Sequence, residues 1–282
     1  MIQRWEDGHG REDCLFFNVW IYRSRCNAIF LKKINDKYDY KQYLPNKTIK
    51  KKGYDKRISS DLSGLTGEAL LDKIYSIIEK YKDDISKCKA VLIEDDLDGK
   101  FYKHSEEQIE AYKNNIIKNV HEKLGKEIPV FILYASPEVE SWFISDWENG
   151  FKYLYCQSGA VTDLESEAKA YFSHQLKQYI DKNILGEYVD EIEEYGWFGD
   201  KYVKLSDEII EAIQVDAKEY MDRMKNANLD YVNQIRQSKD LYYSKKIHGD
   251  RMLRNIKPDI VAKKCRHYFE STYYQLRDMD KV

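Results

Sequence analysis

Several features that define large protein classes are missing from this sequence. It has no long apolar run and no leader-like N-terminal segment, so we expect a soluble, cytoplasmic protein that makes no membrane contact. It has no G-x-x-x-x-G-K-[ST] motif, so any ATP hydrolysis is expected to belong to a partner and not to this chain. Its 5 cysteines form no C-x-x-C pair, and we interpret them as reduced thiols, mostly in the core. It also has no internal repeat and no low-complexity tract.

The chain also lacks an excess of charge of either sign. Its 46 Lys and Arg residues nearly balance 49 Asp and Glu residues, for a net charge of -3. Overall charge therefore argues neither for nor against a nucleic-acid partner, and only local basic patches can. Tyrosine is frequent, with 24 residues in 282, which suits interfaces and base stacking. The length suits one large domain or two smaller ones.

The most informative stretch is an apolar run that ends in acidic residues. Val91 to Ile93 are apolar and mostly β-branched, which predicts a strand buried on both faces of a parallel sheet. Glu94, Asp96 and Asp98 follow at alternate positions, so an extended backbone would send them to one side. Converging carboxylates repel one another unless a hard cation with oxygen ligands lies between them. Ligands of open α/β sheets bind at the carboxyl ends of strands, where this group would lie.

Two other interpretations apply to the same stretch. Asp98-Gly99 is a turn signal, so the acidic residues can simply be solvated at a strand end. The spacing of Glu94, Asp96, Asp98 and Gly99 also imitates the start of an EF-hand. We reject the EF-hand because Ser105 stands where its final Glu is needed and a strand, not a helix, precedes the loop.

A second acidic group follows the next expected strand, residues 128–134. Ser136 would cap a helix with Pro137 at its first position, which puts Glu140 in the first turn above the strand ends. The negative charges of Glu138 and Glu140 can interact favourably with the positive end of the helix dipole, or one of the two side chains can face the site. Near the N-terminus, Glu6 ends an expected strand over residues 1–5 and is either a cap or a ligand.

The remaining patterns predict an α/β domain followed by a helical region. We expect helices over 11–25, 63–82 and 105–124, a strand over 28–34, and a loop or hairpin over 38–57. The helix over 105–124 opens with a Ser105-x-x-Gln108 capping box. This alternation predicts a mostly parallel sheet with flanking helices in residues 1–150. Residues 151–282 are expected to be mainly helical, over 164–184, 206–224 and 231–243, with an interruption at 196–200.

Two segments are strongly basic. The functional interpretation is contact with nucleic-acid phosphates, and a solvated lysine run is at least as common an explanation. The residues concerned are Lys50, Lys51, Lys52, Lys56 and Arg57 in the first segment, and Lys245, Arg251, Arg254, Lys263 and Lys264 in the second. His248 lies in the second segment and is a candidate proton carrier or a structural contact.

Together these pieces resemble TOPRIM-fold proteins of the DUF4276 and RloB-like kind, relatives of OLD-family nucleases. Glu94-x-Asp96-x-Asp98-Gly99 is similar to the D-x-D-x-D-G element of TOPRIM domains. The segment from Pro137 to Asp146 is similar to a P-E-x-E-x-W-x-x-x-D element, and Tyr243 to Gly249 with Cys265 to Phe269 is similar to a C-terminal Y-S-K-x-x-H-G … C-x-H-F element. The usual E-G-x-x-E start is longer here, which leaves Glu6 and Glu12 as alternative ligands.

The resemblance implies a metal-dependent nuclease that acts on DNA or RNA in bacterial anti-phage defence. Mg²⁺, or Mn²⁺, would be held by Glu6, Asp96 and Asp98, with Glu94 and Glu140 assisting. Lys245 or Lys246 would offset phosphate charge, with residues 243–268 packed back on the site. An ATPase partner of ABC or OLD type is implied, and a homo-oligomer is compatible with the sequence. The alternative is a non-catalytic TOPRIM-like scaffold of an ATPase complex.

Overall fold

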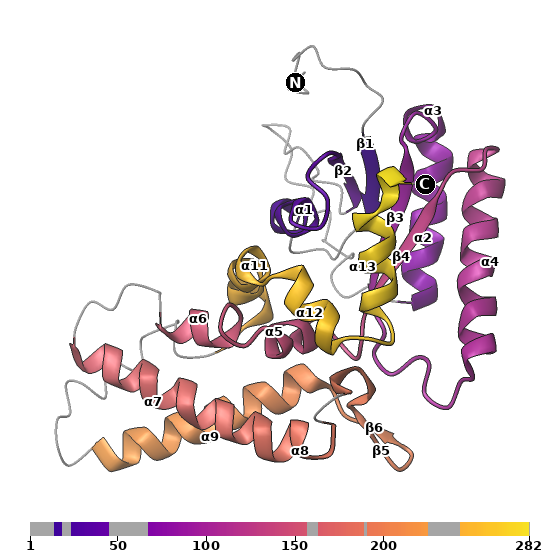
Figure 1. Cartoon of the computed structure of the whole chain (residues 1–282). Helices are drawn as coiled ribbons and strands as arrows, with labels where there is room; N and C mark the ends of the chain where they lie inside the picture. Colours follow the sequence, from indigo (N-terminus) through magenta and orange to yellow (C-terminus); the bar gives the residue numbers. More distant parts are fainter. Residues whose placement is uncertain are drawn as a thin grey trace, which may run out of the picture.

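The computed structural model describes residues 14–18, 24–44, 67–156, 163–188, 191–224 and 243–281 of the chain. A four-stranded parallel sheet organises the described residues (Figure 1). Its strands are β1 (Cys14–Asn18), β2 (Asp39–Leu44), β3 (Ala90–Asp96) and β4 (Val130–Ala135), in the order β2-β1-β3-β4. Strand β3 is therefore an interior strand, paired in parallel with β1 and with β4.

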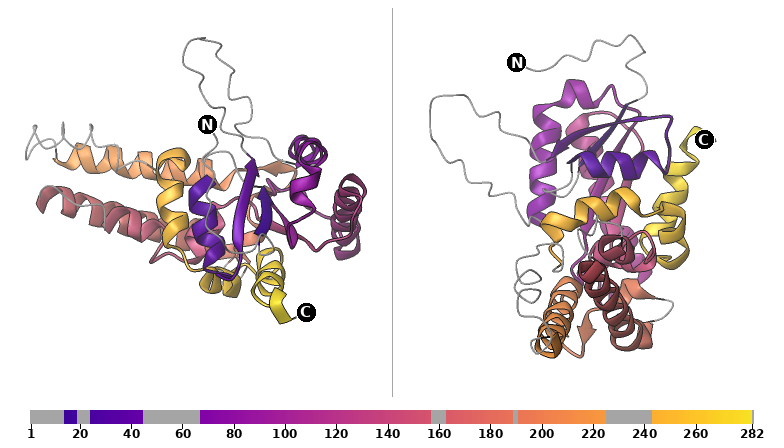
Figure 2. Two further views of the ribbon diagram at one scale, coloured as in Figure 1. Left: turned by 90° about the horizontal axis from the view of Figure 1, so that it is seen from above. Right: turned by 90° about the vertical axis from the view of Figure 1, so that its left-hand side faces the viewer.

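The apolar side chains of β3 pack against both faces of the sheet. All of its residues are buried: Val91 and Ile93 pack into one hydrophobic cluster and Leu92 into the other. Helices α2 (Gly67–Lys80) and α4 (Glu106–Leu124) cover the first face, with the short α3 (Lys82–Ile85) between them in the chain. Helices α1 (Ser24–Lys32) and α13 (Phe269–Arg277) cover the other face, and α11 (Lys245–Asn255) packs against α1 (Figures 1 and 2).

Local signals account for the elements that the sequence predicted here. Helix α4 begins with the Ser105–Gln108 capping box and ends at Gly125, whose φ of 63° closes the last turn. Helix α2 buries one apolar stripe, from Leu70 to Ile78. The strand predictions for the regions of β3 and β4 are likewise confirmed.

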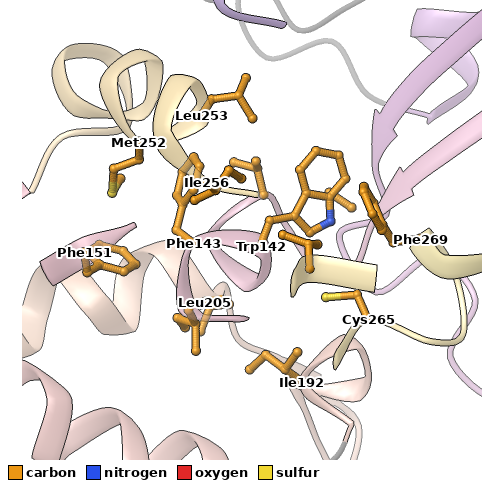
Figure 3. Packing of buried hydrophobic residues seen from close by; sticks show 14 of the residues in the cluster. Trp142, Phe143, Phe151, Ile192, Leu205, Met252, Leu253, Ile256, Cys265 and Phe269 are labelled. Atoms are coloured by element: carbon orange, nitrogen blue, oxygen red, sulfur yellow. The ribbon is translucent and has the colours of Figure 1, made fainter. Parts of the chain in front are cut away.

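The short helix α5 (Glu140–Ser145) lies at the centre of the larger core. All six of its residues are buried. Figure 3 shows Trp142 and Phe143 between side chains of α11, such as Leu253, and Phe269 at the start of α13. Trp142 also stacks on Phe30 of α1, with ring centroids 5.4 Å apart. This packing fixes the helix that carries Glu140.

The rest of the chain adds a helical layer below the sheet. Helices α7 (Asp163–Tyr179) and α9 (Leu205–Met224) lie side by side and extend away from the sheet (Figure 2). The smaller elements are α6 (Phe151–Cys156), η1 (Ile180–Ile184), α8 (Leu185–Tyr188), η2 (Ile192–Glu194), the β5–β6 hairpin (Trp197–Phe198 and Lys201–Tyr202), α12 (Pro258–Lys264) and η4 (Met279–Lys281). Among the described residues, no helix combines the length and the apolar character needed to cross a bilayer.

The expected order of elements is wrong at the N-terminal end of the sheet. Residues 14–18 form β1 where a helix was expected, because pairing on both sides with β2 and β3 supplies hydrogen bonds that no local pattern reveals. Residues 24–32 form α1 where a strand was expected, since Phe30, Leu31 and Ile34 are buried while Ile29 is 42% exposed, a helical spacing. Residues 39–44 of the expected loop form β2.

Other expectations are corrected or refined by the structure, or fall outside the described residues. The helix after β4 begins at Glu140 and not at Pro137, because the Ser136 hydroxyl donates to the Glu193 carbonyl instead of capping. The described part of the C-terminal half is mainly helical, as predicted, and the interruption at 196–200 is part of the β5–β6 hairpin. The strand expected over 1–5 and most of the helix expected over 231–243 lie outside the described residues.

Candidate functional site

Three carboxylates surround one lysine at the carboxyl ends of β3 and β4. The Lys245 Nζ atom lies 3.1 Å from Asp96 Oδ2, 3.4 Å from Glu138 Oε1 and 3.3 Å from Glu140 Oε2. We call Asp96, Glu138 and Glu140 the acidic cluster. Asp96 ends β3, Glu138 follows β4 and Glu140 opens α5, while Lys245 opens α11 from the far end of the chain. The sequence predicted that carboxylates gather at this edge of the sheet, and the structure places three of them there around the Lys245 ammonium.

Each carboxylate is oriented by a second contact. Asp96 Oδ1 accepts a hydrogen bond from the Val139 backbone N at 3.0 Å. Glu138 accepts hydrogen bonds from the Ser206 backbone N and Oγ, each at 3.0 Å, and Glu140 Oε1 accepts one from the Tyr243 hydroxyl. These contacts leave one oxygen of each carboxylate directed at Lys245. The cluster is thus held in place by strand, helix and loop.

Burial makes this concentration of negative charge costly. The side chains of Asp96, Glu138 and Glu140 are 8%, 3% and 0% exposed. Burial raises the pKa of Asp96 well above its usual range; Lys245 opposes this shift, and Glu138 and Glu140 reinforce it. Burial and the Glu140 charge likewise raise the pKa of Glu138. Among the described residues, these three buried carboxylates share the Lys245 ammonium. A proton or a further cation would relieve the repulsion between their like charges.

Asp98 lies at the solvent-facing edge of the cluster. It sits in the turn after β3 with a φ of 46°, and its Oδ1 is 3.0 Å from Lys204 Nζ. Its charge contributes to the raised pKa values of Asp96 and Glu138, so it belongs to the same electrostatic site. Glu94 is buried on the strand face that it shares with Asp96, and its charge contributes to a raised pKa of Tyr40.

His248 lies in the interior of the helix that carries Lys245. It is fully buried in α11, and its Nδ1 accepts a hydrogen bond from the Ser244 backbone N at 2.9 Å. Its ring also stacks on Tyr243, whose hydroxyl donates to Glu140. This geometry fits a residue that positions the start of α11, and with it Lys245.

The predicted basic contacts divide into three groups. Lys245 is not an open phosphate ligand, since its ammonium contacts the acidic cluster. The side chains of Arg251, Arg254, Lys263 and Lys264 are exposed on α11 and α12. The remaining basic candidates lie outside the described residues, namely Lys50, Lys51, Lys52, Lys56, Arg57 and the side chain of Lys246. The candidate metal ligands Glu6 and Glu12 also lie outside them.

Several members of the site were not assigned from the sequence. For Glu138 and Glu140 the sequence left open which of the two faces the site, and the structure places both in the cluster. Tyr243 was noted only as part of the C-terminal motif, and Ser206 and Lys204 carry no local pattern that marks them as members of a site. They reach the cluster only through the tertiary fold, since Ser206 is 68 residues and Tyr243 is 103 residues from its partner.

The donors of the acidic cluster suit a hard divalent cation. They are all carboxylate oxygens, which Mg²⁺ and Mn²⁺ accept, and they already converge on one positive group. A divalent cation would compete with the Lys245 ammonium for them. The Lys245 side chain can move toward solvent because it is 34% exposed. A second set, Glu191, Glu194 and His267, is exposed and could also hold a metal.

Comparison of the chain with protein-family models, with curated proteins and with solved structures finds no match.

Proposed function

We propose that the protein is a Mg²⁺-dependent nuclease with a TOPRIM-like fold that hydrolyses phosphodiester bonds of DNA or RNA. The observation that carries this proposal is the acidic cluster: three oriented, buried carboxylates that converge on the Lys245 ammonium at the carboxyl ends of two parallel strands. Such a site favours the binding of an additional cation and lies where ligands of open α/β sheets bind.

The chain would supply the metal ligands and the charges around the phosphate. Asp96, Glu138 and Glu140 would hold the metal, with Asp98 at the edge. Mg²⁺, when bound, would polarise a phosphate oxygen and acidify or orient the attacking water. Lys245, displaced toward solvent, and Lys204 would offset the charge that develops on the phosphate. Lys204 is placed for this because its side chain is 47% exposed beside Asp98.

The wider role that we propose is that of an effector in anti-phage defence, controlled by an ATPase of ABC or OLD type. The sequence resemblance and the missing nucleotide-binding motif support this proposal. A nuclease that contacts mainly phosphates has little sequence preference and would damage its own cell. Expression of the protein alone is expected to be toxic, and Asp98→Ala is expected to reduce the toxicity. Harmless expression with and without the genomic neighbours would argue against this role.

One observation favours a second function, a non-catalytic scaffold. Lys245 already pairs with all three carboxylates, which is also how a permanent structural ion pair would look. In that case the cluster would fix α11 against α5 and bind no divalent cation.

Cleavage assays separate the two functions. Purified protein is incubated with plasmid DNA, tRNA and total RNA, in Mg²⁺, in Mn²⁺ and in chelator. We expect metal-dependent cleavage that Asp96→Asn abolishes and Asp95→Asn leaves intact. Asp95 is a matched control because it is a buried neighbour on the opposite strand face, bonded to the Gly67 backbone N at 3.0 Å. Equal cleavage by Asp96→Asn and wild type would show that the site is misassigned, and inert protein on every substrate would favour the scaffold.

A further inference from the structure

A cavity lined by aromatic rings is built partly from the two chain segments that carry the acidic cluster. Its volume is about 470 Å³, within the range of small-molecule binding sites. The rings come from three parts of the fold, and we call the space that they line the aromatic cavity. They belong to Phe101, Tyr102, Tyr195, Trp197 and Tyr268.

The β5–β6 hairpin forms one wall of the aromatic cavity. Trp197 stacks on Tyr102 with ring centroids 4.2 Å apart, and its Nε1 donates to the Gly99 carbonyl at 3.1 Å. The Tyr102 hydroxyl donates to the Gly199 carbonyl at 3.2 Å. Gly99 has a φ of 74°, and a Cβ there would lie 2.4 Å from Trp197 Nε1, so the close approach of the hairpin requires glycine. Specific contacts therefore hold this wall in place.

The opposite wall is anchored to the start of α13. The Tyr268 ring stacks on Phe101 at 6.0 Å. Buried Glu193 accepts hydrogen bonds from the backbone N atoms of His267, Tyr268 and Phe269, at 2.7 to 3.3 Å, which holds Tyr268 in place. Lys103, His104 and Glu194 form the exposed edge of the cavity, and the buried polar residues Ser136 and Glu193 line it beside the rings.

The aromatic cavity and the acidic cluster share two chain segments. The turn after β3 contributes Leu97 and Gly99 to the cavity and Asp96 and Asp98 to the acidic site. After β4, Pro137 lines the cavity and the next residue is Glu138. A ligand that fills the cavity therefore lies at the same edge of the sheet as the acidic cluster, against the segments that carry Asp98 and Glu138.

We propose that the aromatic cavity binds an unpaired base of a single-stranded nucleic acid and so presents an adjacent phosphodiester to the acidic cluster. Aromatic side chains stack on bases of any sequence, and bases in a duplex are already stacked and cannot enter such a cavity. This inference rests on the proposed function and adds its substrate class: single strands, loops or unpaired ends.

Binding in chelator tests the inference without cleavage. The probe is a fluorescein-labelled single strand of about 12 nucleotides, as DNA and as RNA, compared with the same sequence in a duplex, by fluorescence anisotropy. We expect the single strand to bind more tightly. Tyr102→Ala and Tyr268→Ala should weaken binding by about 5- to 140-fold, the range measured for loss of one base–aromatic stack. Tyr274→Ala is the matched control, because Tyr274 is similarly exposed, at 41% against 37% for Tyr102, and does not line the cavity.

An abasic scan identifies the bound base. One abasic position should reproduce the loss seen with Tyr102→Ala, and the same abasic strand should lose nothing further with that variant. Equal binding of duplex and single strand, or wild-type binding by both folded variants, would overturn the inference. If Tyr268→Ala does not fold, the binding result for Tyr102→Ala, at a half-exposed position, decides whether the inference holds. A protein that binds bases but never cleaves would refute the proposed function alone, and one that cleaves duplexes without base dependence would refute this inference alone.

Discussion

Replacement of Lys245 by methionine removes the one positive group at the centre of the acidic cluster and keeps a side chain of similar length. The ammonium lies within 3.1 to 3.4 Å of carboxylate oxygens from Asp96, Glu138 and Glu140, which are all buried. Without it, these groups lose an ionic partner, and they must stay ionised, take up protons, or bind another cation. The variant therefore tests whether the cluster carries real negative charge.

The expected cost follows from the geometry. Removing one partner of a buried ion pair costs about 3–5 kcal/mol. Since the Lys245 side chain is 34% exposed, solvent screens part of its interaction, and we expect a loss of about 2–3 kcal/mol of unfolding free energy. Lys204→Met is the matched control because it also removes one positive charge. Lys204 pairs with the more exposed Asp98, so its loss should cost less than about 1 kcal/mol.

Urea denaturation at several pH values and metal concentrations measures these effects. Asp96 and Glu138 have raised pKa values in the folded protein, from burial first, so they take up protons as the pH falls before the unfolded chain does. Protonation removes the charges that Lys245 neutralises, so the stability gap to wild type should shrink from pH ~8 to pH ~5. Millimolar Mg²⁺ should restore part of the lost stability, by about 2.7 kcal/mol at 100 times its dissociation constant.

The reasoning is refuted if Lys245→Met is no less stable than Lys204→Met at pH ~8. In that case the carboxylates would be protonated in the wild type, and the ammonium would contribute little. If the difference in unfolding free energy between Lys245→Met and wild type does not change with pH, the lost stability cannot be assigned to these carboxylates.

Two further variants test charges away from the acidic cluster. Burial raises the pKa of Asp95 to about 7 from 3.8, so its contribution to stability falls as the pH rises through this interval. Asp95→Asn should gain up to about 4 kcal/mol at pH ~8 and nothing at pH ~3 by urea denaturation, and an equal gain at both would contradict the shift. Glu193→Ala removes the acceptor for three backbone N–H groups at the start of α13. It should cost at least about 2 kcal/mol in the same assay and Glu193→Gln less, whereas equal losses would show that the acceptor oxygen is unimportant.

The parts of the fold that the sequence predicted are those whose signals are local. Ser105 and Gln108 cap α4 through contacts within one turn, and the apolar run of β3 is continuous because both faces of an interior parallel strand are buried. Residues 14–18 and 24–32 were misassigned because a short apolar run fits strand and helix alike. The pairing that decides for β1 comes from residues 39–44 and 90–93.

The candidate site divides in the same way. Asp96 and Glu140 could be proposed from their places after a strand and at the start of a helix. Lys245 was expected near the phosphate, and the structure places it among the carboxylates, 149 residues from Asp96. The orienting contacts from Ser206 and Tyr243, and the hairpin that carries the chain to Lys204, exist only once distant segments have packed together.

The most direct test of the central claim is Mn²⁺ binding to the purified protein, measured by electron paramagnetic resonance of the free and bound ion. The wild type and Asp95→Asn should bind Mn²⁺ equally, and Asp96→Asn should bind it at least about tenfold more weakly, because it loses a ligand oxygen of the acidic cluster. Mg²⁺ should displace the bound Mn²⁺. Absence of binding to the wild type, or equal binding by Asp96→Asn, would contradict the account.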